Sequence, residues 1–175
     1  KNKILRLELQ KKSILNRSLN RDMSGQLDLI NEEILNKKFD EFMIKMKTFS
    51  SDLLRLETEI VSMTADKELI RDQLDIKIKI EKGKKKLFEK NVGTLMDTLS
   101  STDQRISVNR QLLTTTGSIE KLKSEKVSIV DQESSYLTGE LVRIAQELSS
   151  FNDQLLQLNE ELIKNELEKS NLFVK

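Results

Sequence analysis

The sequence predicts an all-α protein of long coiled-coil helices that assemble into an elongated multi-helix bundle, dimeric or tetrameric, with at least one partly antiparallel segment. Proline is absent from the 175 residues and glycine occurs only five times, so few positions stop a helix. Charged residues make up 34% of the chain, and 30 basic side chains nearly balance 29 acidic ones, which is typical of a charge-laced helical surface. Apolar residues recur at alternating steps of four and three.

Two helices are expected in the first half of the chain. Residues 1–23 carry a weak apolar stripe and an excess of basic side chains, and a Ser-Gly pair interrupts this basic N-terminal helix. Residues 26–81 form the main coiled-coil helix, whose apolar seam is interrupted by one polar residue, Lys67. Because steps of four and three average about 3.5 residues, this seam stays on one side of an underwound helix and must be covered by another helix.

Two further helices are expected after a change in the frame of the seam. Four residues are in effect inserted at the lysine-rich residues 82–86, which we interpret as a stutter or a turn. A second coiled-coil helix follows over residues 87–113. The Thr-Thr-Thr-Gly-Ser string at 114–118 has poor helix propensity and predicts a hinge or hairpin turn. Residues 119–175 complete the chain as an acidic coiled-coil helix.

The distribution of charge favours an antiparallel arrangement. Residues 1–21 and 77–90 are basic, whereas residues 131–168 carry nine carboxylates against two basic side chains. A fold at Gly117 brings the second basic zone to the acidic zone, and a fold at Gly83 brings the first one there. The sequence leaves both positions open as the true turn. Exposed ion pairs contribute only about 0.2 to 1 kcal/mol each, so they select orientation more than they supply stability.

The candidate functional residues belong to an oligomerisation seam. Its phenylalanines, and the apolar doublets beside it, make the apolar face wider than a two-stranded coil needs, so three or four helices are expected in cross-section. The seam comprises Leu35, Phe39, Phe42, Met46, Phe49, Leu53, Leu56, Ile60, Met63, Ile70, Leu74, Phe88, Val92, Leu95, Leu99, Ile106, Leu113, Leu137, Leu141, Ile144, Leu148, Phe151, Leu155, Leu158 and Leu162.

A cluster of seven lysines within 14 residues is a candidate surface for an anionic partner, such as phospholipid headgroups. Nucleic acid is disfavoured, because no aromatic residue apart from Phe88 lies among the lysines to stack on a base. A solvated turn, or an internal match to the acidic zone, explains the same lysines and is the preferred interpretation. The cluster comprises Lys77, Lys79, Lys82, Lys84, Lys85, Lys86 and Lys90.

No enzymatic constellation emerges from the sequence. The chain has no histidine and no cysteine, which removes the commonest general base, the sulfur nucleophiles and most zinc or copper sites. Its glycines are isolated, so there is no phosphate-binding loop. No apolar run is long enough to span a bilayer, and no signal peptide is present. We expect no catalytic, cofactor-binding or metal-binding residues.

These observations lead to a non-enzymatic coiled-coil oligomerisation segment that acts as a scaffold, spacer or tether in a larger intracellular assembly, cytoplasmic or organelle-associated. Because the chain opens on Lys1 and not on Met, we expect a piece of a longer protein. Its expected partners are further copies of itself, as a homodimer or homotetramer, and other coiled-coil proteins.

Two alternatives stay open at this point. The expected architecture and the basic zone resemble the long antiparallel bundles of the BAR type, and this resemblance implies an elongated helical dimer that binds or shapes anionic membranes. The second alternative is a coiled-coil arm of a chromosome- or kinetochore-associated protein, in which the segment would separate functional ends.

Overall fold

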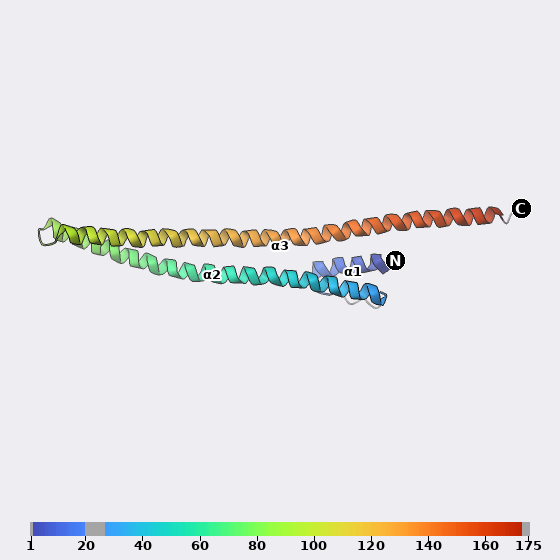
Figure 1. Cartoon of the computed structure of the whole chain (residues 1–175), viewed down its shortest axis with the longest axis horizontal. Coiled ribbons are helices and arrows are strands. Elements are labelled where there is room, and N and C mark those ends of the chain that lie inside the picture. Colours follow the sequence, from blue (N-terminus) through green and yellow to red (C-terminus); the bar gives the residue numbers. More distant parts are fainter. Residues whose placement is uncertain (1, 20–26, 173–175) are drawn as a thin grey trace. The chain divides into compact units, whose positions relative to one another are not determined.

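A computed structural model describes residues 2–19 and 27–172, with side chains to residue 169, and these residues are almost entirely helical (Figure 1). In chain order the helices are α1 (Asn2–Asn16), α2 (Leu29–Glu89) and α3 (Leu95–Leu172). No strand occurs among the described residues, which confirms the all-α class. The expected Ser-Gly interruption at residues 24 and 25, and the last three residues of the expected C-terminal helix, lie outside the described residues.

The chain divides into two compact units, to which both long helices contribute. Unit 1 contains α1, the part of α2 up to Phe49 and the part of α3 from Asp131. Unit 2 is Ser50–Val130, and therefore holds the remainder of α2, the turn and the beginning of α3.

In unit 1 the short helix α1 packs against both long helices. Lys3 Nζ lies 5.4 Å from the centre of the Phe151 ring, and Arg17 forms an ion pair of 3.1 Å with Glu133. Since the contacts on α3 move toward lower numbers as α1 advances, α1 and α3 are antiparallel. Figure 1 shows α1 running in the same direction as the neighbouring part of α2. The basic N-terminal helix thus lies beside acidic residues of α3.

The core of unit 1 receives apolar side chains from all three helices. Leu7 of α1, Leu35 and Phe42 of α2, and Ile144 of α3 are each at most 2% exposed. The Tyr136 ring of α3 lies 6.2 Å from the Phe42 ring in a stacked arrangement. Aromatic pairs at this separation add to the stabilisation supplied by their buried area.

Helix α1 is shorter than the expected helix over residues 1–23, because a left-handed residue ends it. Arg17 has a φ of 51°. Its N–H donates to the Ile14 carbonyl at 3.2 Å, and the N–H of Ser18 donates to the Ser13 carbonyl at 3.1 Å. This pair of hydrogen bonds is the Schellman motif, which satisfies carbonyls at the C-terminal end of a helix.

Unit 2 is an antiparallel helical hairpin. Lys126 Nζ of α3 donates to Glu57 of α2 at 3.1 Å, and farther along α2 Lys77 Nζ donates to Gln104 of α3 at 2.9 Å. From the first contact to the second, α2 advances by 20 residues while α3 recedes by 22. The two helices therefore face each other in one continuous register.

The chain reverses at residues 90–94, which differs from both turns expected from the sequence. Helix α2 continues through 82–86, and helix α3 continues through 114–118. A Cβ atom at Gly83 or Gly117 would meet nothing within 4 Å, so neither position needs glycine. A single glycine in a helix costs only about 1 kcal/mol relative to alanine, and the packing of a long helix outweighs that amount.

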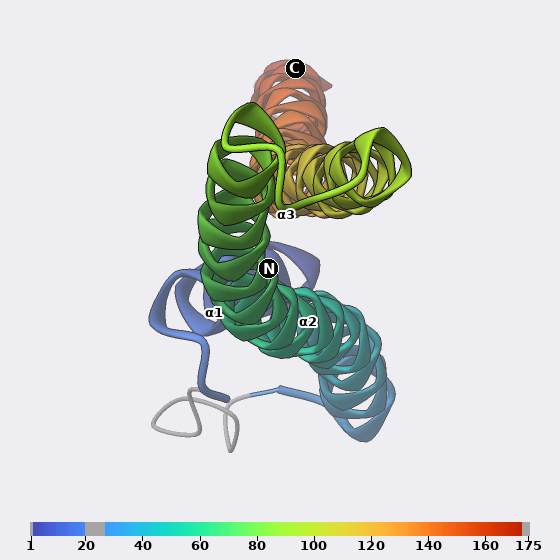
Figure 2. The ribbon, with the colours of Figure 1, turned by 90° about the vertical axis from the view of Figure 1, so that its left-hand side faces the viewer.

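A second Schellman motif makes the reversal at the end of α2. Asn91 has a φ of 57°, in the left-handed region that asparagine tolerates better than most residues. Its N–H donates to the Phe88 carbonyl at 2.9 Å, and the N–H of Val92 donates to the Leu87 carbonyl at 2.9 Å. The N–H of Gly93 also donates to the Leu87 carbonyl, at 3.1 Å. Figure 2 looks onto this turn.

Thr94 caps the N-terminus of α3 directly after the turn, in a sequence with the capping-box pattern. The N–H of Asp97 donates to Thr94 Oγ1 at 3.1 Å, and the Thr94 hydroxyl lies 2.7 Å from Asp97 Oδ2. The Thr94 hydroxyl is the main cause that lowers the pKa of Asp97 below its ordinary value. Together the two motifs satisfy backbone groups at both sides of the reversal.

We expect opposite effects from alanine at different glycines. A Cβ at Gly93 would lie 3.2 Å from Leu87 Cβ and from the backbone N of Phe88, so Gly93→Ala should lower the free energy of unfolding by about 1 kcal/mol. Gly83→Ala and Gly117→Ala, the matched controls, should raise it by roughly 0.5 to 1 kcal/mol. Urea denaturation followed by circular dichroism measures these changes, and stabilisation by Gly93→Ala would contradict the turn geometry.

The aromatic core of unit 1 supplies a second prediction. Phe42→Ala removes a side chain that is 2% exposed, so the free energy of unfolding should fall by about 3 to 5 kcal/mol. The adjacent Met43 is exposed, and Met43→Ala should change this free energy by no more than about 0.5 kcal/mol. Urea denaturation of both variants checks the difference, and equal effects would show that Phe42 does not occupy the core.

Candidate interaction surface at the hairpin end

The interior of the hairpin becomes polar toward the turn. The four-three frame of α2 continues past the end of its apolar seam without a slip, and its next inward positions are Lys77, Glu81 and Lys84. Opposite them, α3 contributes the buried Thr98 and Ser101. Helix α2 is therefore not interrupted at 82–86. The seam residues after the lysines follow a different frame because they belong to the turn and to α3, after the chain has reversed.

Glu81 is the centre of this polar interior and is only 6% exposed. Its carboxylate accepts a hydrogen bond of 2.7 Å from the Thr102 hydroxyl and forms ion pairs with Arg105 Nε at 2.6 Å and Lys85 Nζ at 3.2 Å. The Thr102 hydrogen bond is the largest cause that lowers the pKa of Glu81 below 4.5, its ordinary value, and the two cations act in the same direction. The buried carboxylate therefore stays charged at neutral pH.

Three lysines of the predicted cluster turn toward partners in their own chain. Lys77 donates to Gln104, Lys85 pairs with Glu81, and Lys84 pairs with Asp97 at 3.5 Å. These lysines join α2 to α3 or to its own preceding turn. Internal pairing thus accounts for part of the cluster, although the partners lie near the turn and not in the acidic zone.

The other four lysines form a stripe on the outer face of α2 and on the residue that follows it, and we call them the lysine stripe. They follow one another at steps of three, four and four residues, which places them on one face of a helix. All are exposed, and none forms an ion pair with a carboxylate of the described residues. The lysine stripe comprises Lys79, Lys82, Lys86 and Lys90.

Apolar side chains gather around the turn beside the lysine stripe, and we call them the apolar tip. Val92 and Met96 are each 76% exposed, and the other members are between 41% and 55% exposed. Single exposed apolar residues are normal on a protein surface. A group of them around one turn is a feature of interaction sites. The apolar tip comprises Leu87, Phe88, Val92, Leu95 and Met96.

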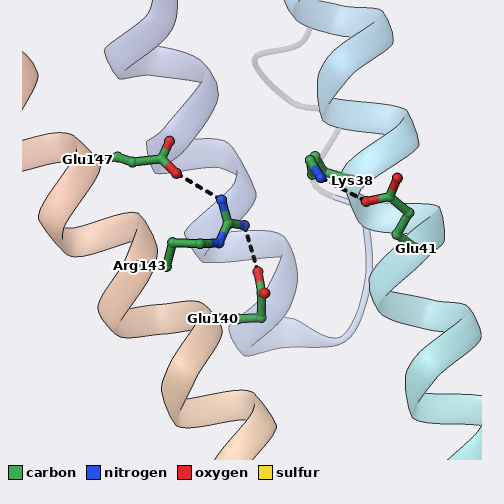
Figure 3. Close-up of polar contacts among 5 residues, drawn as sticks. All are labelled: Lys38, Glu41, Glu140, Arg143 and Glu147. Atoms are coloured by element: carbon green, nitrogen blue, oxygen red, sulfur yellow. Dashed lines mark hydrogen bonds and ion pairs between the residues drawn. The ribbon is translucent and has the colours of Figure 1, made fainter.

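The charged groups of unit 1 pair mainly along single helices. Figure 3 shows Arg143 of α3 between Glu140 and Glu147, at 2.6 and 2.8 Å, while Lys38 and Glu41 pair on α2 at 2.8 Å. The Glu140 carboxylate is the main cause that raises the pKa of Arg143. Pairs three and four residues apart support their helix by a few tenths of a kcal/mol, which explains this arrangement.

Hollows and metal-binding groups add little to the candidate surface. Two hollows, of about 560 Å³ beside Leu54 and Thr58 and of about 470 Å³ beside Asn2 and Asp28, are shallow and open to solvent. A third, of about 110 Å³ beside Lys3 and Phe151, is smaller than the roughly 300 Å³ typical of ligand pockets. Over the described residues, no three histidine, cysteine, aspartate or glutamate side chains gather closely enough to hold a metal ion. In the same part of the chain, none of the helices combines the length and the apolar character needed to cross a bilayer.

Most of the predicted seam on α2 is covered by the chain itself. In unit 1 its members are buried or half-buried: Leu35, Phe39, Phe42, Met46 and Phe49. The same holds in unit 2 for Leu53, Leu56, Ile60, Met63, Ile70 and Leu74. The need for a covering helix, inferred from the spacing, is met here by helices of the same chain.

After Leu74 the seam residues divide into two groups. Those that the chain covers at least partly are Ile106, Leu137, Leu141, Ile144, Leu148, Phe151 and Leu155. Those that remain exposed are Phe88, Val92, Leu95, Leu99, Leu113, Leu158 and Leu162.

The inward face of α3 in unit 2 is displaced by one residue from the predicted seam. Thr98 and Leu112, not Leu99 and Leu113, lie on the face toward α2. Sequence reasoning missed these positions because several of them are polar. These inward positions could have been predicted from the sequence Thr94-Leu-Met-Asp97. Its capping-box pattern gives the beginning of α3 and hence the register of the helix.

The charge and the apolar character of the hairpin end indicate the kind of partner that it can bind. No protein-family model and no curated protein matches this sequence. The lysine stripe and the apolar tip lie beside each other at one end of unit 2, on a helix and turn held by the Schellman motif and the Thr94 cap. This combination suits a partner that is both anionic and partly apolar.

The charge of Glu81 predicts a pH-dependent stability. Because folding lowers its pKa below 4.5, ionised Glu81 stabilises the fold above pH 4.5, and this contribution is lost as the pH falls through the folded-state pKa. Glu81→Gln should lower the melting temperature at pH 7, and the difference from the wild type should shrink in acid.

Glu89→Gln is the matched control, since Glu89 is exposed and forms no ion pair with the described residues. Circular dichroism melting curves from pH 7 to below pH 4.5 measure both variants. An equal loss from Glu81→Gln at every pH would show that the carboxylate charge is not the stabilising feature.

Proposed function

We propose that this protein is a non-catalytic helical scaffold or tether that associates with a second copy of itself through one flank of unit 2. The observation that carries the proposal is a row of apolar residues on α3 that the fold of a single chain leaves uncovered. Leu99, Leu113 and Val127 are 56%, 64% and 60% exposed and lie 14 residues apart. With the half-buried Ile106, they occupy four of five successive heptad positions, and the exposed Glu120 occupies the fifth, between Leu113 and Val127.

Exposed residues of α2 extend the same flank. Leu54 and Val61 each follow an inward seam residue by one position, just as Leu99 and Leu113 follow the inward Thr98 and Leu112. An antiparallel helix pair has a local twofold axis perpendicular to the plane of the two helices, so equivalent positions of both helices lie on one flank. The apolar flank, as we call it, comprises Leu54, Val61, Leu99, Ile106, Leu113 and Val127.

Because unit 2 has a small apolar interior, burial of the apolar flank by a second copy would add much to its stability. Its buried apolar side chains are Leu56, Ile70, Val108 and Ile119, because two helices cover only one face of each other. Burial of one leucine side chain is worth about 1.5 to 3 kcal/mol. Two hairpins that meet through their apolar flanks form a four-helix arrangement, in which each helix covers a wider apolar face.

The charge of the chain permits association of identical copies. The net charge is +1, so two copies repel each other little. A second copy supplies the same row of apolar residues, which satisfies the self-complementarity that a twofold interface requires. The scaffold role rests on this association, since a pair of long hairpins presents separated ends to other components of an assembly.

The mass of the protein in solution tests the proposal. Sedimentation equilibrium over a concentration series should give twice the chain mass of 20.3 kDa for the wild type. Leu99→Gln combined with Leu113→Gln should weaken the dimer by about 100-fold or more, because two apolar side chains per copy lose their burial.

Leu29→Gln combined with Ile30→Gln is the matched control, since both residues are exposed and belong to unit 1, whereas the apolar flank belongs to unit 2. This control should keep the dimer. A wild type that stays monomeric at every concentration, or a dimer that the flank variant leaves unchanged, would overturn the proposal.

A further inference from the structure

We propose that the hairpin end of unit 2 docks onto the surface of an anionic phospholipid bilayer, with the apolar tip in the interfacial region and the lysine stripe on the headgroups. The docking is independent of self-association, because it uses none of the residues of the apolar flank. Its partner is the lipid surface itself, and not a protein or a nucleic acid.

The charge of the hairpin end matches an anionic surface. Residues 77–99 contain seven lysines and three carboxylates, a net charge of +4. Two of these carboxylates, Glu81 and Asp97, are paired with lysines that do not belong to the lysine stripe. The stripe is therefore available to lipid phosphates and acidic headgroups, at about 1 kcal/mol or fivefold in affinity for each lysine near the surface.

The apolar tip fits the interfacial region of a bilayer. Val92 lies in the reversal and Met96 in the first turn of α3, and both are largely exposed; Leu87, Phe88 and Leu95 lie at the ends of the two helices. The described helices are not apolar enough to cross a membrane, so the contact is a shallow one. Basic side chains beside apolar ones are the combination that holds a segment at the interface, where each class meets its own layer.

The internal bonding of the hairpin end favours docking without refolding. The Schellman motif satisfies the last carbonyls of α2, and Thr94 caps α3. Backbone polar groups that are already paired can approach the interface without loss of their hydration energy. Aromatic residues are scarce here, with Phe88 alone, which disfavours stacking on nucleic-acid bases.

Tryptophan fluorescence provides a direct test, because the chain has no tryptophan of its own. Met96→Trp places one probe in the apolar tip, and Val92→Trp is a second variant if the first alters the helix content. With vesicles of phosphatidylcholine and phosphatidylserine, emission should shift to the blue and be quenched by brominated acyl chains. Ile44→Trp, at a position 68% exposed in unit 1, is the matched control and should respond little.

Charge variants separate the lysine stripe from general electrostatic attraction. Lys82→Gln, Lys86→Gln and Lys90→Gln together should reduce vesicle partitioning by about 100-fold. Lys37→Gln, Lys47→Gln and Lys121→Gln change the net charge by the same amount at exposed positions elsewhere and should have a much smaller effect. Binding should also weaken as the salt concentration rises.

Three outcomes would overturn the proposal. The first is an unchanged tryptophan emission with anionic vesicles, and the second is equal binding to vesicles of phosphatidylcholine alone. The third is binding to an acidic polypeptide such as polyglutamate without quenching by brominated lipid, which would assign the surface to a protein partner. Solution mass is measured separately, so failure of docking and failure of self-association are distinguishable.

Discussion

The hydrogen bonds that reverse the chain at Asn91 determine which residues of the two long helices of unit 2 meet. The carbonyls of Leu87 and Phe88 accept the N–H groups of the turn, and Thr94 starts the next helix. Because these hydrogen bonds fix the C-terminal end of α2 and the N-terminal end of α3, the alignment of the two helices close to the turn is also fixed. The inward faces, the position of the lysine stripe and the uncovered flank all follow from that alignment.

The sequence was sufficient for the class of fold and for most of the apolar seam on α2. Helix content follows from the missing proline and the four-three spacing, and the seam from Leu35 to Leu74 is covered as its spacing required. The position of the turn was not found, because isolated glycines in long helices are weak stop signals. Asn91, followed by Gly93 and a capping box, was the stronger signal.

The candidate surface could be predicted only in part, because its details depend on the position of the turn. The lysine cluster is evident in the sequence, but the division into inward and outward lysines depends on which residues of α3 face α2. Lys84 meets Asp97 across the turn, and Lys79 meets no carboxylate of the described residues. Likewise, the exposed face containing Leu113 becomes visible only once Leu112 is known to face inward.

The buried Glu81 has a consequence for the fidelity of folding. Heptad repeats are degenerate, since a hairpin whose helices slide by seven residues still places apolar positions opposite one another. In such a slipped hairpin the Glu81 carboxylate would lose Thr102 and Arg105 and keep only Lys85 of its own helix, which leaves a desolvated charge with fewer partners. The buried carboxylate therefore destabilises slipped alignments relative to the native one, and the two long helices pair in a single register.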